Sequence, residues 1–297
     1  MQSKALVLCL HAACALTLTR RSLGAGLALR PLAAFAAPPQ ADEAAAVDAA
    51  LRSFNRGDYG GALEAWVRLT ALAPESALYW SNRGTCELIL GSNSATLGAR
   101  PTGEPLRLLE AAVASLERAD GLPGPTDALA LNNLGNAKAV LLDWPGAALA
   151  YDASDAAATA ARDRAFASLP ALNRACVALE LGEPEDAARR TATLLRRDPN
   201  IIDGHALEAA LKYRAGDATG AEAAYAKVCV PAVGSPDGFR APKPGIGGTE
   251  FCEFYASADA VRGRWTPTAV DAYATFLASR DTRARVAADT RPFGELP

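Results

Sequence analysis

Apolar residues recur at helical spacing along most of the chain, in segments separated by short turns. After the turn Gly57-Asp58-Tyr59 come Ala62 and Trp66, four positions apart, as on one face of a helix. A second turn, Gly182-Glu183-Pro184, is matched 34 residues later by Gly216-Asp217-Ala218. Helical spacing with a period of 34 residues predicts repeated pairs of antiparallel helices.

The residue types at these positions suit such a pair. A turn glycine accepts the left-handed backbone that ends the first helix, and the acid after it can cap the second helix. Small residues let the two helices approach, and large aromatic residues fill the gap to the next pair; a pair cannot bury its apolar face alone, so pairs must stack. The small residues are Ala62, Ala147, Ala187 and Ala221, and the aromatic ones are Trp66, Tyr151 and Tyr225.

The predicted fold class is all-α: a right-handed α-solenoid of about five helical hairpins followed by C-terminal capping helices. The abundance of alanine, with only 6% aromatic residues, favours helices over strands. Two places depart from the repeat: an insertion at 91–105, and the turn Leu142-Asp143-Trp144, which lacks glycine. The predicted parts are a targeting segment (1–36), the solenoid (43–230), a Pro/Gly-rich loop (231–249), capping helices (250–281) and a tail (282–297).

The 34-residue pattern resembles the tetratricopeptide-repeat (TPR) family over about residues 43–230. Three further strings resemble the lumenal TPR proteins of plants and algae: Trp80-Ser81-Asn82-Arg83-Gly84, Leu131-Asn132-Asn133-Leu134-Gly135 and Arg264-Trp265-Thr266-Pro267. The resemblance implies a non-catalytic scaffold that binds a protein or peptide segment in a concave groove. It also implies a role in photosystem assembly or maintenance.

Asparagines recur at one position of the first helices. Asn82, Asn133 and Asn173 share that position, which in TPR proteins faces the groove, where their amides can hold an extended peptide by its backbone. In the alternative interpretation they bond the neighbouring helix and fix the geometry of the repeat. Arg83 and Arg174, each one residue after a repeated asparagine, are the only basic candidates near the groove, so a clamp for acidic chaperone tails is not expected. The complete set of candidate groove residues is Asn82, Asn132, Asn133, Asn136, Asn173, Arg83 and Arg174.

The first forty residues contain four basic residues and no acid. The pair Arg20 and Arg21 opens an apolar run that closes at Ala34-Phe35-Ala36, which is the pattern of a twin-arginine signal with a cleavage site at Ala34 and Ala36. A shorter signal precedes it, and such a tandem leader resembles those of thylakoid-lumen proteins. The alternative is one bacterial signal leading to a periplasm. Removing the four basic residues would change the net charge from −3 to −7, which disfavours nucleic acid and membrane partners.

Candidate chemistry is sparse. Cys229 and Cys252 bracket the Pro/Gly-rich stretch and could form a disulfide in an oxidising compartment, whereas Cys86 and Cys176 lie in helical patterns as small buried residues. His205, the one histidine after the leader, has no nucleophile beside it in the sequence. We therefore predict no catalytic site, metal or cofactor. A small enzymatic appendage at 229–280 is the alternative.

Overall fold

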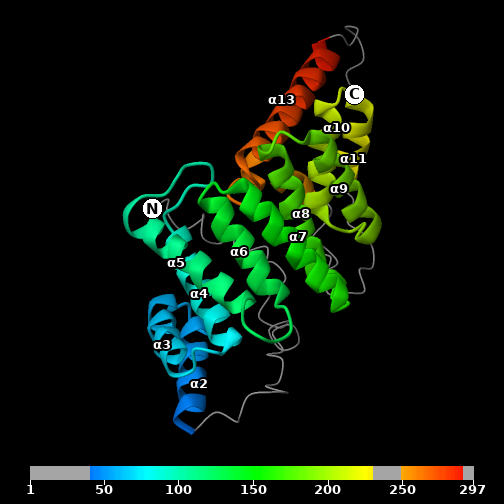
Figure 1. Cartoon of the computed structure of the whole chain (residues 1–297). Coiled ribbons are helices and arrows are strands. Elements are labelled where there is room, and N and C mark those ends of the chain that lie inside the picture. Colours follow the sequence, from blue (N-terminus) through cyan, green and yellow to red (C-terminus); the bar gives the residue numbers. More distant parts are fainter. Residues whose placement is uncertain (1–40, 230–248, 290–297) are drawn as a thin grey trace. The chain divides into compact units, whose positions relative to one another are not determined.

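The computed structural model describes residues 41–229 and 249–289, and within these ranges the chain is helical without strands (Figure 1). The all-α prediction is therefore confirmed. The chain divides into two compact units at Pro170. The boundary falls inside helix α8 (Arg164–Glu180), where Pro170 has no N–H to donate to the preceding turn.

The first unit holds three helical hairpins, each made of two consecutive helices (Figure 1). Short connections between consecutive helices make them antiparallel neighbours. The helices are α2 (Ala41–Asn55), α3 (Tyr59–Leu72), α4 (Ala77–Ser92), α5 (Gly103–Asp120), α6 (Ala128–Val140) and α7 (Trp144–Ala160).

The second unit holds two hairpins and a C-terminal segment that packs against them. Its core is one cluster to which the hairpins and residues 255–277 both contribute. Beyond α8 its elements are α9 (Pro184–Arg197), α10 (Ile202–Arg214), α11 (Ala218–Cys229), α12 (Thr249–Tyr255), the 3-10 helix η1 (Ala258–Ala260) and α13 (Pro267–Asp289).

The hairpin turns follow the predicted chemistry, with two exceptions. Gly57 has a φ of 80°, and the Asp58 carboxylate accepts a hydrogen bond from the Gly61 N–H at the start of α3. In the turn without glycine, Leu142 itself adopts the left-handed conformation with a φ of 65°. Glu183, unlike the aspartates, makes no capping bond with its side chain.

The small and aromatic repeat residues are buried, as predicted. Ala62, Ala147, Ala187 and Ala221 are fully buried, and Trp66, Tyr151 and Tyr225 are at most 3% exposed. Trp66 on α3 lies 5.8 Å from Tyr79 on α4, measured between ring centroids, so it links the first hairpin to the second. Helices α4 and α5 approach each other closely at Gly84, where a Cβ atom would lie only 2.6 Å from the Leu116 side chain on α5.

Several helix boundaries differ from those expected from the sequence. The insertion is shorter, because α4 continues to Ser92 and α5 begins at Gly103. In the region predicted to hold capping helices (250–281), α12 ends at Tyr255, and α13 continues to Asp289, into the segment predicted as a tail. The targeting segment, most of the Pro/Gly-rich loop and the last eight residues lie outside the described residues.

Candidate functional site

Helices α4 and α6 of the first unit carry a surface of small polar side chains. The Asn133 amide on α6 donates a 3.1 Å hydrogen bond to the Thr85 hydroxyl on α4. Asn82 lies one helical turn before Thr85, and all three side chains are half-buried. Nearby, the Ser81 hydroxyl donates to the carboxylate of Asp127, which also caps α6. We call these five residues the α4/α6 polar surface.

Asn82 and Asn133 are therefore in different situations. Asn133 is bonded to the neighbouring helix, which agrees with the interpretation that the asparagines fix the geometry of the repeat. The Asn82 side chain forms no hydrogen bond with any residue that the structure describes. Its amide can both donate and accept, so it can bond the backbone of a bound segment.

The two flanking asparagines lie inside the unit rather than on its surface. Asn132 is 2% exposed and Asn136 5% exposed. The Tyr151 hydroxyl of α7 donates a 2.8 Å bond to the Asn136 side-chain oxygen, so this asparagine joins the two helices of its own hairpin. Neither residue is presented to a ligand.

Arg83 is engaged on a different side of α4. Its guanidinium lies 5.0 Å from the Trp80 ring and pairs at 2.9 Å with Glu87, which is 3% exposed. Glu87 also accepts a 2.6 Å bond from the Ser115 hydroxyl of α5. The buried carboxylate is thus neutralised and bonded, and Arg83 stabilises the hairpin through this pair.

Arg174 has a similar structural role in the second unit. Only 10% of its side chain is exposed, and its guanidinium lies 3.5 Å from Asp186 and 3.9 Å from Glu183, at the start of α9. Burial opposes ionisation of Asp186, but Arg190, Arg189 and Arg174 together outweigh it and lower the pKa of this carboxyl. Arg174 thus ties α8 to α9.

Asn173 belongs to the second unit, so the polar surface defined above contains only two of the three repeated asparagines. Asn173 is half-buried and already makes a contact within the protein. Three residues after it comes Cys176, at the position that Thr85 holds after Asn82. Cys176 is 2% exposed.

The C-terminal segment of the chain covers this side of the second unit. The Thr266 hydroxyl donates a 3.0 Å bond to the Cys176 carbonyl, and the Thr268 N–H donates a 2.7 Å bond to Glu180, also on α8. Arg264 pairs with Asp203 on α10 at 2.6 Å. In the second unit, therefore, the part of α8 that follows Asn173 is bonded by the chain itself.

His205 on α10 is a packing residue. Its Nε2 lies 2.8 Å from the Pro199 carbonyl, its side chain is 9% exposed, and Nδ1 lies 3.7 Å from Glu208. Within the described residues no group of three or more His, Cys, Asp or Glu could hold a metal ion. No described helix is long and apolar enough to cross a membrane.

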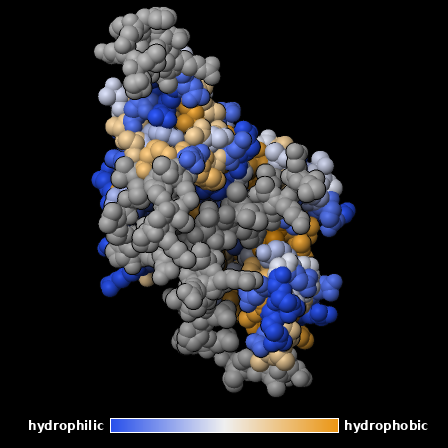
Figure 2. Space-filling model, turned by 180° about the vertical axis from the view of Figure 1, so that it is seen from behind, coloured by the Kyte–Doolittle hydropathy of each residue, from blue (hydrophilic) through white to orange (hydrophobic). Residues whose placement is uncertain are grey.

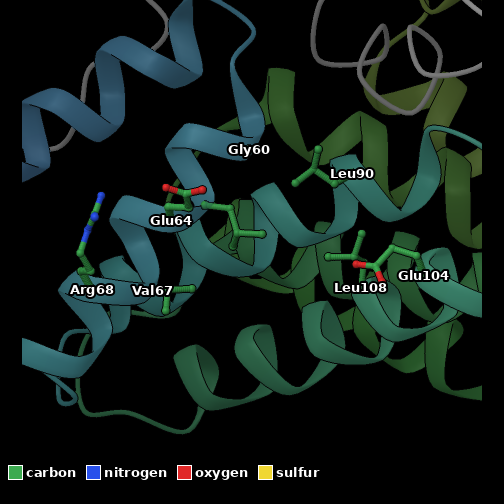
Figure 3. A pocket seen from close by; sticks show the side chains of 8 residues that line it. Gly60, Glu64, Val67, Arg68, Leu90, Glu104 and Leu108 are labelled. Atoms are coloured by element: carbon green, nitrogen blue, oxygen red, sulfur yellow. The ribbon is translucent and has the colours of Figure 1, made fainter.

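An open hollow of about 640 Å³ lies between α3, α4 and α5 (Figure 3). Its walls are apolar with charged residues at the rim, and Val67 is 41% exposed. Hydrophobic residues are interspersed with hydrophilic ones on the face shown in Figure 2, as is usual for protein surfaces. The hollow is lined by Gly60, Leu63, Glu64, Val67, Arg68, Leu90, Glu104 and Leu108.

Sequence reasoning did not find Thr85, Ser81 and Asp127 as part of the polar surface, nor Asp203, Tyr255 and Arg264 as a network. The sequence could have placed Thr85 at this surface, because it follows Asn82 by three residues and so lies on the same face of the helix, about one turn further on. No sequence pattern indicates the Asp203 network, because Tyr255 and Arg264 are 52 and 61 residues away from Asp203 in the sequence.

The fold and these surfaces define an all-α helical-repeat protein of TPR-like architecture. No family model matches the chain, and no curated protein does. Among solved structures it is similar to MamA, a TPR-like helical-repeat protein, with a TM-score of 0.50 and 18% identity over 62% of this chain and 88% of MamA. A MamA RS-1 ArsTM double mutant gives a TM-score of 0.51 at 16% identity, over 63% of this chain and 93% of the mutant.

Proposed function

We propose that this protein is a non-catalytic scaffold that binds a protein segment at the α4/α6 polar surface. One observation carries the proposal: Thr266 and Thr268 of the chain itself bond to α8 of the second unit, where Cys176 is buried, whereas its counterpart Thr85 on α4 is only half-buried, beside Asn82 and Asn133. A helix face that the protein does not fill itself is available to a partner.

The chemistry of this surface favours a neutral, extended segment. Its exposed groups are amides and hydroxyls, which can bond to backbone N–H and C=O groups regardless of sequence. Asp127 is its one charged member and is exposed, so an acidic tail would be repelled. Arg83 and Arg174, the basic candidates, are already paired with acids of the protein.

We further propose that the protein works in the thylakoid lumen, in photosystem assembly or maintenance. The twin-arginine leader supports this location. The disulfide between Cys229 and Cys252 supports an oxidising compartment in general, which also fits a periplasmic adaptor. The alternative of an enzymatic appendage at 229–280 has less support, because Asp203, Tyr255 and Arg264 are bonded to one another.

The binding proposal is tested by comparative capture with folded variants. Wild type, Asn82→Ala/Asn133→Ala and Asn55→Ala would be used as bait, with partners identified by mass spectrometry and their affinities measured with the purified partner. Asn55 is an exposed residue at the end of α2 and serves as the matched control. Losing two amides worth about 0.5–1.5 kcal/mol each should weaken binding about ten-fold or more. A partner that binds all three proteins equally would contradict the proposed site.

Export is tested separately. Replacing Arg20 and Arg21 by lysine should block recognition by a twin-arginine translocase, so a larger precursor should accumulate outside the final compartment. Import into isolated chloroplasts, with fractionation of the thylakoid lumen, would measure this. Unchanged processing and delivery of the lysine variant would refute twin-arginine export.

A further inference from the structure

A disulfide joins the end of α11 to the short helix α12. Cys229 and Cys252 are 23 residues apart in the sequence, and their Cα atoms are 4.6 Å apart. Neither cysteine is fully buried. Residues 253 and 254 beside it are exposed, and Phe254 is 54% exposed.

Apart from Cys252, the described side chain of α12 that is buried in the unit is Tyr255. This side chain is 5% exposed, and its hydroxyl donates a 2.7 Å bond to Asp203 on α10. Arg264 binds the other carboxylate oxygen of Asp203 at 2.6 Å. The Tyr255 carbonyl in turn accepts a 2.7 Å bond from the Tyr273 hydroxyl of α13. Among the described side chains of α12, Cys252 therefore provides a covalent attachment and Tyr255 a non-covalent one.

We propose that the Cys229–Cys252 disulfide is a site of thiol–disulfide exchange with a protein dithiol, and that its reduction releases α12 and uncovers the Asp203–Arg264 pair. The inference is independent of peptide binding at the α4/α6 polar surface. It assigns the bond a regulatory role in addition to its structural one.

The exchange proceeds in two balanced steps. A thiolate of the dithiol attacks one sulfur of the disulfide, forms a mixed disulfide and releases the other cysteine as a thiolate, which takes up a proton. The second thiol of the dithiol then attacks the mixed disulfide and frees the remaining cysteine. Two electrons and two protons pass to this protein, and the dithiol ends as a disulfide.

Reduction releases α12 and not α13 because the two helices differ in how many buried side chains anchor them. Helix α13 is anchored by Ala269, Tyr273 and Phe276, each fully buried, so it stays in place without the disulfide. Helix α12 buries Tyr255 alone among its described side chains. Closure of a loop of this length favours docking of α12 about three hundred-fold, which is at least as much as one buried large side chain supplies.

The two other cysteines that the structure describes do not attack the disulfide or the mixed disulfide. Cys86 is buried, and burial raises the pKa of its thiol to about 12. Cys176 is also buried, and the pKa of its thiol is raised further by the same cause. Since thiolates are the reactive species, both groups are inert at neutral pH.

Hydrogen exchange of the full chain, measured by mass spectrometry, tests the proposal. The protein would be compared oxidised, after reduction with dithiothreitol, and after incubation with a thioredoxin-type dithiol protein. We expect exchange within α12 to rise at least ten-fold on reduction, with α10 and α13 unchanged. Cys252→Ser should show the same rise without any reductant, and Cys86→Ser should behave as wild type.

A further variant separates the two attachments. Tyr255→Phe removes the bond to Asp203, so it should scarcely affect the oxidised protein and should accelerate α12 exchange further in the reduced one. Unchanged protection of α12 after complete reduction would overturn the proposal. An equal rise over α10, α12 and α13 would also overturn it, because the disulfide would then hold the whole unit. Should Cys252→Ser fail to fold, the oxidised and reduced wild type give the same comparison.

Discussion

The side-chain amide of Asn133 is bonded to the hydroxyl of Thr85, so a recurring asparagine of one first helix is tied to the first helix before it. Asn82, at the same repeat position, has no such bond among the described residues. Asn133 thus fits the interpretation that the asparagines fix the geometry of the repeat, whereas Asn82 fits the interpretation that they bind a ligand. The difference predicts that equivalent substitutions will have different effects on stability.

Asn133→Ala should lower the free energy of unfolding by about 1 kcal/mol, because it leaves the half-buried Thr85 without its donor. Asn82→Ala should change it by less than about 0.5 kcal/mol. Urea unfolding followed by circular dichroism measures both. Equal losses for the two variants would show that Asn82 also has a structural bond in solution.

Ala187→Trp should destabilise the fourth hairpin strongly. Ala187 is fully buried at the start of α9, and an indole there must push the helices apart, at a cost of at least about 3 kcal/mol. Its neighbour Ala188 is exposed, so Ala188→Trp is the matched control and should be nearly neutral. Thermal unfolding of the two variants would decide. Similar melting temperatures would mean that the hairpin tolerates separation of its helices.

Gly84→Ala tests the close approach of α4 and α5. The new methyl group would lie 2.6 Å from the Leu116 Cγ and 3.2 Å from the Ala112 carbonyl oxygen, which is backbone and cannot rotate away. We expect a loss of about 1–3 kcal/mol, measured by urea unfolding. Gly60→Ala meets nothing within 4 Å and should instead stabilise by about 0.5–1 kcal/mol. A stabilising Gly84→Ala would show that the two helices are further apart than described.

The lowered pKa of Glu208 on α10 predicts that the stability of the protein depends on pH. The His205 imidazole and the Lys212 ammonium group hold the pKa of this carboxyl at about 2, below its usual 4.5, although burial opposes them. The folded state therefore binds this proton less readily, so the stabilisation is complete above pH 4.5 and is lost as the pH falls towards 2.

Glu208→Gln should flatten the fall of unfolding free energy between pH 4.5 and 2.5, measured by urea unfolding in a pH series. Glu110→Gln, at an exposed position on α5, is the control and should keep the wild-type slope. Parallel pH profiles for wild type and Glu208→Gln would remove Glu208 as the source of the dependence.

The hairpins were predictable because their determinants are local. A turn glycine, an aspartate and an alanine at fixed offsets specify each hairpin, and the structure reproduces this around Gly57, Asp58 and Ala62. Even the turn without glycine keeps its geometry, because Asp143 still caps α7 and the neighbouring Leu142 takes the left-handed conformation. Helix ends were less certain, since α13 lacks a strong stop signal after Arg280.

The fate of individual asparagines was not predictable, because it depends on partners from other helices. Asn136 accepts a bond from Tyr151, which lies on the second helix of the hairpin, and this places it inside the unit. Coverage of the second unit rests on contacts such as that between Thr266 and Cys176, 90 residues apart. No spacing rule relates such distant positions, so the sequence alone could not reveal which face remains available.

The packing of α13 limits how this repeat array can grow. Repeat proteins usually gain length by duplication of a hairpin, and a new hairpin would have to stack on the last one, formed by α10 and α11. Here Phe276 lies 5.9 Å from Tyr213 of α10, and the Arg280 guanidinium lies 4.1 Å above the Tyr225 ring of α11. That surface is already used, so lineages of this protein should gain hairpins by insertion upstream of α10 and keep the C-terminal end constant.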